Sequence, residues 1–139
     1  MITFRVQHVH AGSPCVPIEG LLDSAYSECL ESGVMDRRKW IELNLDILSS
    51  EDRIEIGAFE DGYLVGGMTL AEEMDAHVGA CVSVRYNYVL PEYRTLKLGT
   101  IMMRHAIQLA KTLGPQYIAF THRKGVGLYT IRYRRLHEA

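Results

Sequence analysis

The sequence predicts an α/β protein of the α+β kind, in which helices flank both faces of a central, mostly antiparallel sheet of about six strands. Two observations lead to this prediction. Along the chain, the spacing of apolar residues changes from two to three or four and then back to two, which is typical of strands interrupted by helices. The length of 139 residues and the 47% hydrophobic content suit one folded domain. We therefore expect a single domain over residues 1–139.

The first half of the chain is predicted to hold three strands and two helices. In order, we expect a strand over residues 2–8, helices over residues 18–30 and 36–49, and strands over residues 53–58 and 63–71. Alternating apolar and polar residues indicate the strands, and apolar residues at helical spacing indicate the helices. Gly33 ends the first helix, and Asp61-Gly62 predicts a hairpin turn between the last two strands.

The second half is predicted to hold one helix and three more strands. In order, we expect a polar connection over residues 72–77, a strand over residues 80–90, a helix over residues 100–113, and strands over residues 117–122 and 129–136. Pro91 closes the long strand because it lacks a backbone donor. Gly114-Pro115 ends the helix, and a glycine-rich connection separates the last two strands.

Charge is distributed unevenly along the chain. Residues 1–79 hold 5 basic and 15 acidic residues, a balance of −10, whereas residues 80–139 hold 10 basic and 2 acidic residues, a balance of +8. A concentrated basic half attracts anions such as phosphates or nucleic acid, although the two halves can also pair with each other across the fold.

Cysteine use and hydropathy limit the cofactors and the cellular setting. Cys15, Cys29 and Cys81 include no C-x-x-C pair, so we expect reduced thiols rather than disulfides or a thiolate zinc site. His8 and His10 with Cys15 would give too few ligands for zinc, and we expect no metal. Apolar stretches stay under ten residues and the N-terminus lacks a signal peptide, so we expect a soluble, cytoplasmic protein without membrane contact.

The segment from Val89 to Thr100 carries the densest functional signal. It connects the longest predicted strand to the following helix and contains Arg94, Lys97 and Gly99. The unpaired amides of a helix's first turn and the helix dipole favour an anion, and a glycine lets the backbone approach it closely. Many strand–loop–helix junctions contain an arginine and a glycine without binding anything, so this pattern alone also permits a structural role.

The same segment resembles the signature of the GNAT family of N-acetyltransferases. In that family the fourth strand ends in V-x-P-x-Y-R, and a phosphate loop R/Q-x-x-G-x-G/A leads into a long helix. The strand end is matched by Val89, Pro91, Tyr93 and Arg94, and the fixed loop positions are held by Arg94, Lys97 and Gly99. Lys97 departs from the pattern, which usually has glycine there. The order of elements is also similar to that of the family over about residues 1–122.

The resemblance implies that acetyl-CoA is the co-substrate, bound by the end of the strand and by the loop. It assigns the pantetheine contact to Val89 and the pyrophosphate contacts to Arg94, Thr95, Leu96, Lys97, Leu98, Gly99 and Thr100. Lys97 is unfavourable if the loop needs a positive φ, but its charge attracts polyphosphate. The implied reaction is transfer of an acetyl group to a primary amine of a small molecule or protein, by direct attack within a ternary complex.

The resemblance also implies candidate acid–base residues. Family members often carry N-x-x-A-x-x-F/Y-Y after the fifth strand, with the final tyrosine near the sulfur of CoA. These four positions are occupied by His122, Gly125, Leu128 and Tyr129, so only the final tyrosine of the pattern is retained. Tyr129 is therefore the predicted proton donor to the thiolate, and His122 is the reserve acid or base. Gly125 and Gly127 disfavour the helix on which the family presents this tyrosine, and the alternation from Tyr129 onward favours a strand, in which Tyr129 could instead pack.

No general base is assigned from the sequence. The family often has a glutamate on the fourth strand, where this chain has Ser83, Arg85 and Asn87. We expect solvated side chains at four titratable positions of the preceding connection, Glu72, Glu73, Asp75 and His77. An ordered water chain is therefore the expected route for the proton of the amine.

Other functions stay open at this stage. A degenerate member of the same fold would bind CoA or a protein without catalysis, and a larger pocket would take a longer acyl group. A nucleic-acid or acidic-protein binder is the rival class, suggested by Arg123, Lys124, Arg132, Arg134 and Arg135 with Tyr129 and Tyr133. We expect these arginines to decorate the outer face of a terminal strand, so nucleic acid is not the expected partner. The acidic first two helices favour an amine at the acceptor site, and a homodimer is left open.

Overall fold

The computed structural model describes residues 1–14, 16–28, 33 and 35–137. Its elements, in chain order, are β1 (Ile2–Val9), α1 (Val16–Glu28), α2 (Arg37–Ser49), β2 (Arg53–Glu60), β3 (Tyr63–Asp75), β4 (Gly79–Val89), the short 3-10 helix η2 (Pro91–Leu96), α3 (Leu98–Lys111), β5 (Tyr117–Gly125) and β6 (Leu128–Arg135). The predicted order of strands and helices is confirmed, with η2 as the one added element among the described residues.

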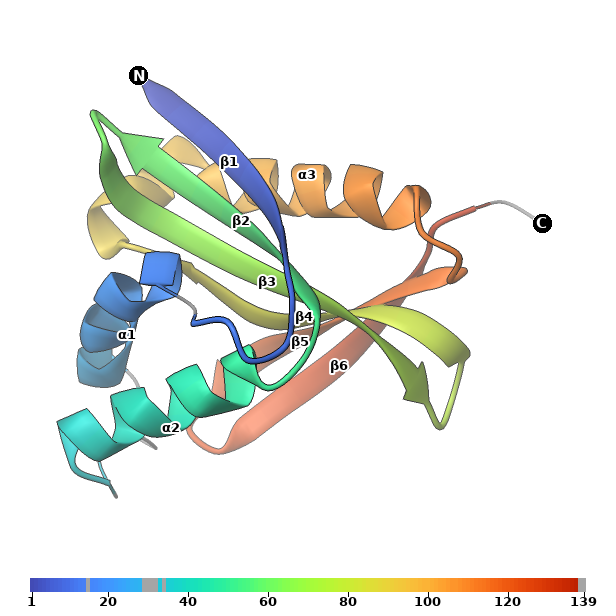
Figure 1. Cartoon of the computed structure of the whole chain (residues 1–139), viewed down its shortest axis with the longest axis horizontal. Helices are drawn as coiled ribbons and strands as arrows, with labels where there is room; N and C mark the ends of the chain where they lie inside the picture. The colour runs from blue at the N-terminus through green and yellow to red at the C-terminus, as the bar shows by residue number, and fades with distance from the viewer. Residues whose placement is uncertain (15, 29–32, 34, 138–139) are drawn as a thin grey trace.

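The six strands form one mixed sheet in the order β1-β2-β3-β4-β5-β6 (Figure 1). Neighbouring strands are antiparallel except β4 and β5, which run parallel. A parallel pair needs a crossover connection, and α3 supplies it. The mostly antiparallel sheet predicted from the sequence is confirmed, and its order in space follows its order in the chain.

Helices cover both faces of the sheet, as predicted. Gly66 and Gly67 are neighbours on β3, so a side chain at each would point to opposite faces. A Cβ at Gly66 would lie 3.0 Å from the sulfur of Met102 on α3, and one at Gly67 would lie 2.9 Å from Leu21 Cδ1 on α1. Thus α3 packs on one face, behind the sheet in Figure 1, while α1 and α2 pack on the other.

Two apolar clusters hold these layers together. The larger one joins the sheet to α3 and includes Met68, Val82 and Met102, each fully buried. The smaller one joins α1 and α2 to the opposite face through Ile18, Leu22 and Leu48, with Tyr86 and Trp40 packed against it. Both helical layers are therefore fixed to the centre of the sheet, where β3 and β4 lie.

The predicted polar connection over residues 72–77 is wrong, because β3 continues to Asp75. Glu73 pairs with Cys81 and Asp75 with Gly79 in the β3–β4 ladder. Strand preference depends more on cross-strand partners than on the residue itself, and the apolar start of β4 supplies such partners. The helix predicted from Thr100 in fact starts at Leu98, whose side chain is buried in the larger core.

The last two strands form a ribbon, here called the β5–β6 ribbon (Tyr117–Arg135). The strand predicted to end at His122 continues to Gly125, and a tight turn leads into β6 with Gly127 at a φ of +69°. Glycine adopts this left-handed conformation without strain. Within the described residues, no helix lies between β5 and β6, which agrees with the effect expected of the two glycines.

The other sequence expectations concern membranes and thiols. Among the described residues, no helix combines the length and the apolar content needed to cross a membrane. Cys81 is a buried, unbridged thiol. Cys15 and Cys29 lie outside the described residues.

Candidate active site

A bulge and an early end of strand pairing leave one edge of β4 open. Leu70 pairs with Val84 and Thr69 with Tyr86, so Arg85 is an extra residue with no backbone pairing partner in the β3 register. On its other side, β4 pairs with β5 only at residues 81–83. The β5-facing backbone of residues 84–89 therefore has no strand partner. This is the one parallel junction in the sheet, and the two strands separate beyond it.

A groove of about 380 Å³ lies where this open edge meets the start of α3. Its lining comes from β4, η2 and α3 and consists of Asn87, Tyr88, Val89, Arg94, Lys97, Gly99 and Thr100. Five of these seven residues belong to the set assigned to acetyl-CoA from the sequence. Asn87 and Tyr88 were missed, because the early end of β4–β5 pairing that leaves them beside an open edge has no trace in the apolar alternation.

The start of α3 offers backbone donors at the groove. The Ile101 amide donates the first helical hydrogen bond to the Lys97 carbonyl at 3.2 Å, so the amides of Leu98, Gly99 and Thr100 have no acceptor within the helix. Lys97 adopts φ 55° and ψ 30°, the left-handed region. Lys97 forms no ion pair with any other described residue. The groove thus combines backbone N–H groups, the positive end of a helix dipole and an unpaired ammonium, which together suit a phosphate.

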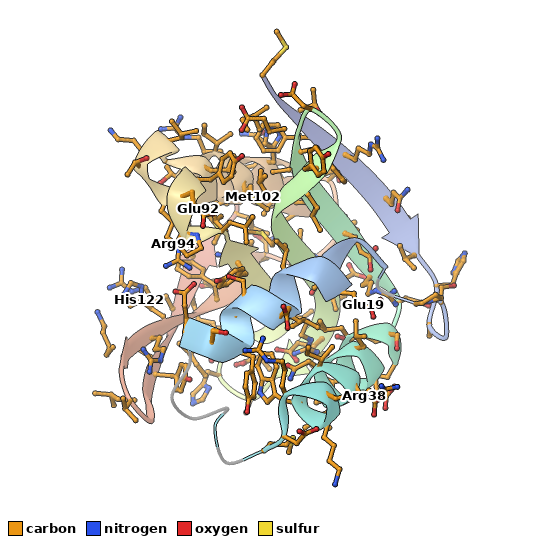
Figure 2. All side chains as sticks on the ribbon, turned by 90° about the vertical axis from the view of Figure 1, so that its left-hand side faces the viewer. Glu19, Arg38, Glu92, Arg94, Met102 and His122 are labelled. Carbon is orange, nitrogen blue, oxygen red and sulfur yellow. The ribbon has the colours of Figure 1, made fainter. Side chains whose placement is uncertain are left out.

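Arg94, also on the groove, is held by three groups of the protein. Its Nε donates to the Val89 carbonyl at 3.0 Å, and its two terminal nitrogens donate to the two carboxylate oxygens of Glu28 on α1, at 2.8 and 2.9 Å. The guanidinium also lies over the Tyr88 ring, 5.3 Å from its centroid. Figure 2 shows Arg94 between the C-terminal end of α1 and the N-terminal end of α3.

Glu28 links this arginine to a second polar pair. Tyr88 donates its hydroxyl proton to Glu28 and also hydrogen-bonds to Ser24 of α1 at 2.8 Å. The hydrogen bond from Arg94 is the main reason that the pKa of Glu28 is lowered from its ordinary value. Desolvation, followed by the bond to Glu28, raises the pKa of Tyr88. Glu28 is thus ionised and Tyr88 protonated at neutral pH.

Three of the predicted loop residues do not line the groove with their side chains. Thr95 and Leu96 lie on η2 and are exposed, Leu96 at 55%. The Leu98 side chain is 1% exposed and fills the core, so only its amide is available to a ligand. Val89 is likewise 7% exposed, which leaves its backbone as the contact.

His122 and Tyr129, the predicted acid–base residues, lie on the β5–β6 ribbon and not among the residues that line the groove. His122 pairs with Thr130 and Arg123 with Tyr129, and paired residues share a face. Because His122 and Arg123 are consecutive, His122 and Tyr129 point to opposite faces of the ribbon. Tyr129 is 47% exposed and lies in a strand, as its alternation predicts. Figure 2 shows His122 on the side of the molecule that carries Arg94.

The basic residues of β6 do not form one continuous face. This strand is the edge of the sheet. Arg132 and Arg134 point to the same face as their cross-strand partners Phe120 and Ile118. Arg135 points to the other face, where its guanidinium lies 5.7 Å from the centroid of the Tyr117 ring. Division between two faces reduces the charge that either face could present to a nucleic-acid backbone.

The titratable residues near the β3–β4 turn bond to one another. Asp75 accepts hydrogen bonds from the His77 amide at 2.7 Å and from the Tyr133 hydroxyl at 3.0 Å. The bond from the His77 amide is the main reason that the pKa of Asp75 is lowered. Asp75 is therefore part of a structural network, whereas the sequence predicted a solvated side chain there. The His77 side chain is 76% exposed, as the sequence predicted.

Glu73 is also engaged. Arg85, the bulged residue, contacts Glu73 at 2.7 Å and Glu51 at 2.8 Å. Glu73, Asp75 and Cys81 offer ligand atoms within 4.8 Å of one another. Arg85 already balances the charge of Glu73, and burial raises the pKa of the Cys81 thiol. We therefore interpret this group as part of the hairpin's packing.

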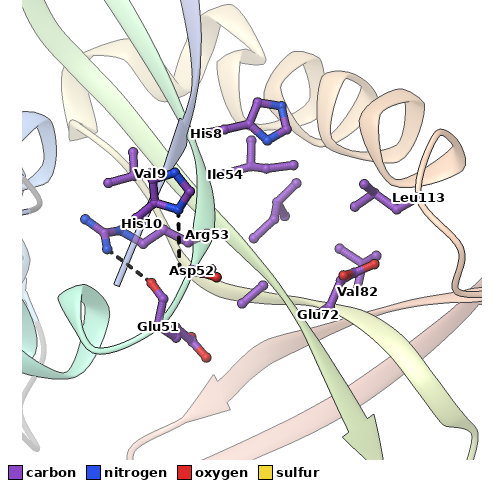
Figure 3. Close-up of a pocket in the computed structure, with 12 residues that line it drawn as sticks. His8, Val9, His10, Glu51, Asp52, Arg53, Ile54, Glu72, Val82 and Leu113 are labelled. Atoms are coloured by element: carbon purple, nitrogen blue, oxygen red, sulfur yellow. Dashed lines mark hydrogen bonds and ion pairs between the residues drawn. The ribbon is translucent and has the colours of Figure 1, made fainter. Parts of the chain in front are cut away.

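Two other cavities lie away from the groove. One of about 410 Å³ lies near the end of β1 and the start of β2 (Figure 3), with Ile54 and Leu70 in its lining. At its rim, His10 Nδ1 lies 3.9 Å from Asp52 Oδ1. The second, of about 620 Å³, lies between residues 72–80 and 114–117. Neither contains a residue assigned to acetyl-CoA, and neither lies at the start of a helix.

The groove beside β4 fits the two recognisable parts of acetyl-CoA. An open strand edge can pair with the amide groups of the pantetheine arm, and the start of α3 with Lys97 can bind the diphosphate. The sequence profile of the acetyltransferase (GNAT) family matches residues 18–133. The chain belongs to this family. As a GNAT protein it is an acetyl-CoA-dependent N-acetyltransferase.

Solved structures agree on the fold. The chain is similar to a Pyrococcus furiosus protein described as an acetyl transferase, with a TM-score of 0.68, 17% identity and coverage of 87% of this chain and 83% of that one. It is similar to an acyl-CoA N-acyltransferase from Pseudomonas aeruginosa, with a TM-score of 0.63, 17% identity and coverage of 88% and 80%. It is also similar to a ribosomal-protein-alanine N-acetyltransferase from Brucella melitensis, with a TM-score of 0.59, 17% identity and coverage of 88% of this chain and 82% of that one. No curated protein sequence gives a significant match.

Proposed function

We propose that this GNAT protein acetylates a primary amine, on a small molecule or a protein, by direct attack within a ternary complex. One observation carries the proposal: the open edge of β4 and the start of α3 meet in a single groove. In the transfer, the amine nitrogen bonds to the acetyl carbon as the bond from that carbon to sulfur breaks. The amine loses a proton, and the departing thiolate gains one.

The proposed cofactor contacts follow the geometry of the groove. The backbone at Val89 would pair with the pantetheine arm, because the β5-facing edge of β4 has no strand partner there. The amides of Leu98, Gly99 and Thr100 and the ammonium of Lys97 would bind the diphosphate. Thr95 and Leu96 remain predicted loop contacts on the exposed side of η2.

The proposed acceptor approaches on the face that α1 and α2 cover. The paired acids of these helices are Asp23 with Arg37, Glu28 with Arg94 and Glu42 with Arg38. Glu19 and Asp46 form no ion pair with other described residues, and neither does Lys39 of α2, so these three groups leave a net charge of −1. This remaining negative charge supports a cationic amine as the acceptor.

The proposed acid is Tyr129, with His122 in reserve. Tyr129 points to the same face of the ribbon as Tyr133, which is the face of α1 and α2, whereas His122 points to the face of α3. Only one of them can therefore serve a thiolate on a given side of the ribbon. No side chain is proposed as the base, and water remains the expected carrier of the amine proton.

Binding and turnover test the proposal separately. Calorimetry with acetyl-CoA should give measurable heat, and millimolar acetyl-CoA should raise the melting temperature, because a ligand of the native state stabilises it. A panel of primary amines and amino-terminal peptides should then release free thiol. Absence of both heat and thermal shift would overturn the proposal. Binding without thiol release across the panel would favour a degenerate CoA-binding member of the family.

A further inference from the structure

The contacts of Arg94 point to a role for Glu28 that the family signature does not contain. A guanidinium has five N–H donors. Three of them are used within the protein: one bonds to the Val89 carbonyl, and two bond to the carboxylate of Glu28. Arg94 is nevertheless part of the groove lining. Its charge is therefore balanced by an anion of the protein at the place where an anionic ligand would bind.

The bonds of Arg94 occupy two groups that the cofactor would use, its own paired donors and the Val89 carbonyl. A carboxylate binds the paired donors of a guanidinium in the same bidentate way as a phosphate. The Val89 carbonyl, which accepts from Arg94 Nε, belongs to the strand edge proposed for the pantetheine arm. Lys97 has no such counter-charge among the described residues. Of the two cations of the groove, Arg94 is therefore neutralised by a carboxylate of the protein and Lys97 is not.

We propose that Glu28 is a positioning residue that holds Arg94 toward α1 and competes with the diphosphate of CoA for it, so that Glu28 lowers the affinity of the groove for CoA. This inference rests on the proposed function of the groove. Without a ligand, Lys97 is then the cation of the groove whose charge is not neutralised by the protein. Arg94 becomes available to the diphosphate only when its bonds to Glu28 break.

The same contact links the cofactor groove to α1. Glu28 and Ser24 are one turn apart on that helix, and both bond to Tyr88 of β4. When the diphosphate takes Arg94, Glu28 keeps only its bond to Tyr88. Because α1 is proposed to frame the acceptor, occupation of the groove changes the charge available on the acceptor side, and the coupling is reciprocal.

The substitution Glu28→Gln tests the competition. Glutamine keeps the size of the side chain and its ability to accept from Tyr88, but it deletes the negative charge. CoA should bind about threefold to tenfold more tightly, because one repulsive charge beside the diphosphate is removed. Pantetheine, which has no phosphate, should bind the variant and the wild type equally. Both affinities are measured by calorimetry.

Asp23→Asn is the matched control. Asp23 lies on the same helix and pairs with Arg37 at 2.6 Å, and neither residue lines the groove. Its substitution removes the same charge from α1 and should leave CoA affinity unchanged. A gain in both variants would mean that only the overall charge of the helix matters, and would overturn the assignment to Glu28.

A measurement on the wild type avoids any folding defect of the variant. The Glu28 carboxyl carbon can be titrated by nuclear magnetic resonance with and without CoA. Loss of Arg94 to the diphosphate should raise the pKa of Glu28, because its main stabilising hydrogen bond is lost. A purely structural ion pair would keep its pKa low in both titrations.

The outcomes separate this inference from the proposed function. If the wild type binds CoA, but Glu28→Gln binds it equally or more weakly and the pKa of Glu28 stays low, Glu28 does not compete with the diphosphate. The assignment of the groove to CoA is then unaffected. If the wild type binds no CoA, the proposed function and this inference both fall.

Discussion

The junction of β4 and β5 has two parts with opposite properties. In the first part, residues 81–83 of β4 pair with residues 117–119 of β5, and Cys81 and Val82 are fully buried. In the second part, beyond the bulge at Arg85, β4 has no strand partner on the β5 side, and its open edge lines the groove. One continuous strand thus serves as core at one end and, under the proposed function, as a binding edge at the other.

The difference between these parts is a difference in how backbone groups are satisfied. Buried N–H and C=O groups need partners, and in the paired part the neighbouring strand provides them. In the separated part, the edge of β4 and the first amides of α3 are left for a ligand or solvent. Substitutions in the separated part should therefore change function, and substitutions in the paired layers should change stability.

The largest effect should come from Tyr129→Phe in the separated part. If Tyr129 protonates the thiolate, turnover should fall by about 100-fold while CoA affinity stays the same, since general acids contribute at least this much. Steady-state kinetics with an active amine, together with calorimetry, provide both values. Tyr63→Phe is the control, because Tyr63 is 77% exposed at the β2–β3 turn. Wild-type turnover in Tyr129→Phe would mean that Tyr129 only packs in the fold, and His122 would then be the residue to substitute next.

Lys97→Ala should give the next largest effect. Loss of a charge-assisted bond to phosphate costs about 1–3 kcal/mol, so CoA affinity should fall by roughly fivefold or more. Lys111→Ala is the matched control, since Lys111 lies in the last turn of the same helix, away from the groove. Equal affinity in wild type and Lys97→Ala would mean that the start of α3 binds phosphate through its amides alone.

Most of the fold could be predicted from the sequence, because its determinants are local. Alternation and helical spacing identified each strand and each α-helix, though not η2, and Asp61-Gly62 identified the hairpin turn that the structure confirms at positive φ. The loop residues Arg94, Lys97 and Gly99 were found for the same reason, since their order along the chain is itself the signal.

The missed features depend on contacts between distant segments. Nothing in the alternation of β4 indicates the bulge at Arg85, because the extra residue is defined only by its absence from the β3 register. The bond from Arg94 to Glu28 joins residues 66 positions apart. The acidic run in residues 72–75 suggests a loop, yet Arg85 and Tyr133 provide the partners that keep it in a strand.

A smaller, purely structural effect is expected from Gly67→Ala under α1. The new Cβ would lie 2.9 Å from Leu21 Cδ1 and 3.3 Å from Ile18 Cγ1, and both side chains are buried. Overpacking of this kind costs about 1–3 kcal/mol of unfolding free energy. Chemical denaturation should detect the loss, whereas Gly114→Ala, which meets no atom within 4 Å, should show none. A large change in CoA affinity without a stability loss would contradict the division between the two parts.

The smallest effect on stability is expected from Lys97→Gly, which separates the geometry of the loop from its charge. Lys97 already adopts φ 55°, so glycine should leave the path of the chain unchanged and only relieve the left-handed strain. The left-handed conformation costs a residue other than glycine about 1–2 kcal/mol, and the greater backbone entropy of glycine in the unfolded chain offsets about 0.5–1 kcal/mol of that, so the free energy of unfolding should rise by about 0.5–1 kcal/mol. CoA affinity should fall as far as in Lys97→Ala, because both variants lose the same charge. Asp61→Gly relieves the other described left-handed residue that is not glycine, at φ 50°, and should leave CoA affinity unchanged. Tighter CoA binding by Lys97→Gly than by the wild type would instead mean that backbone geometry limits the groove more than charge does.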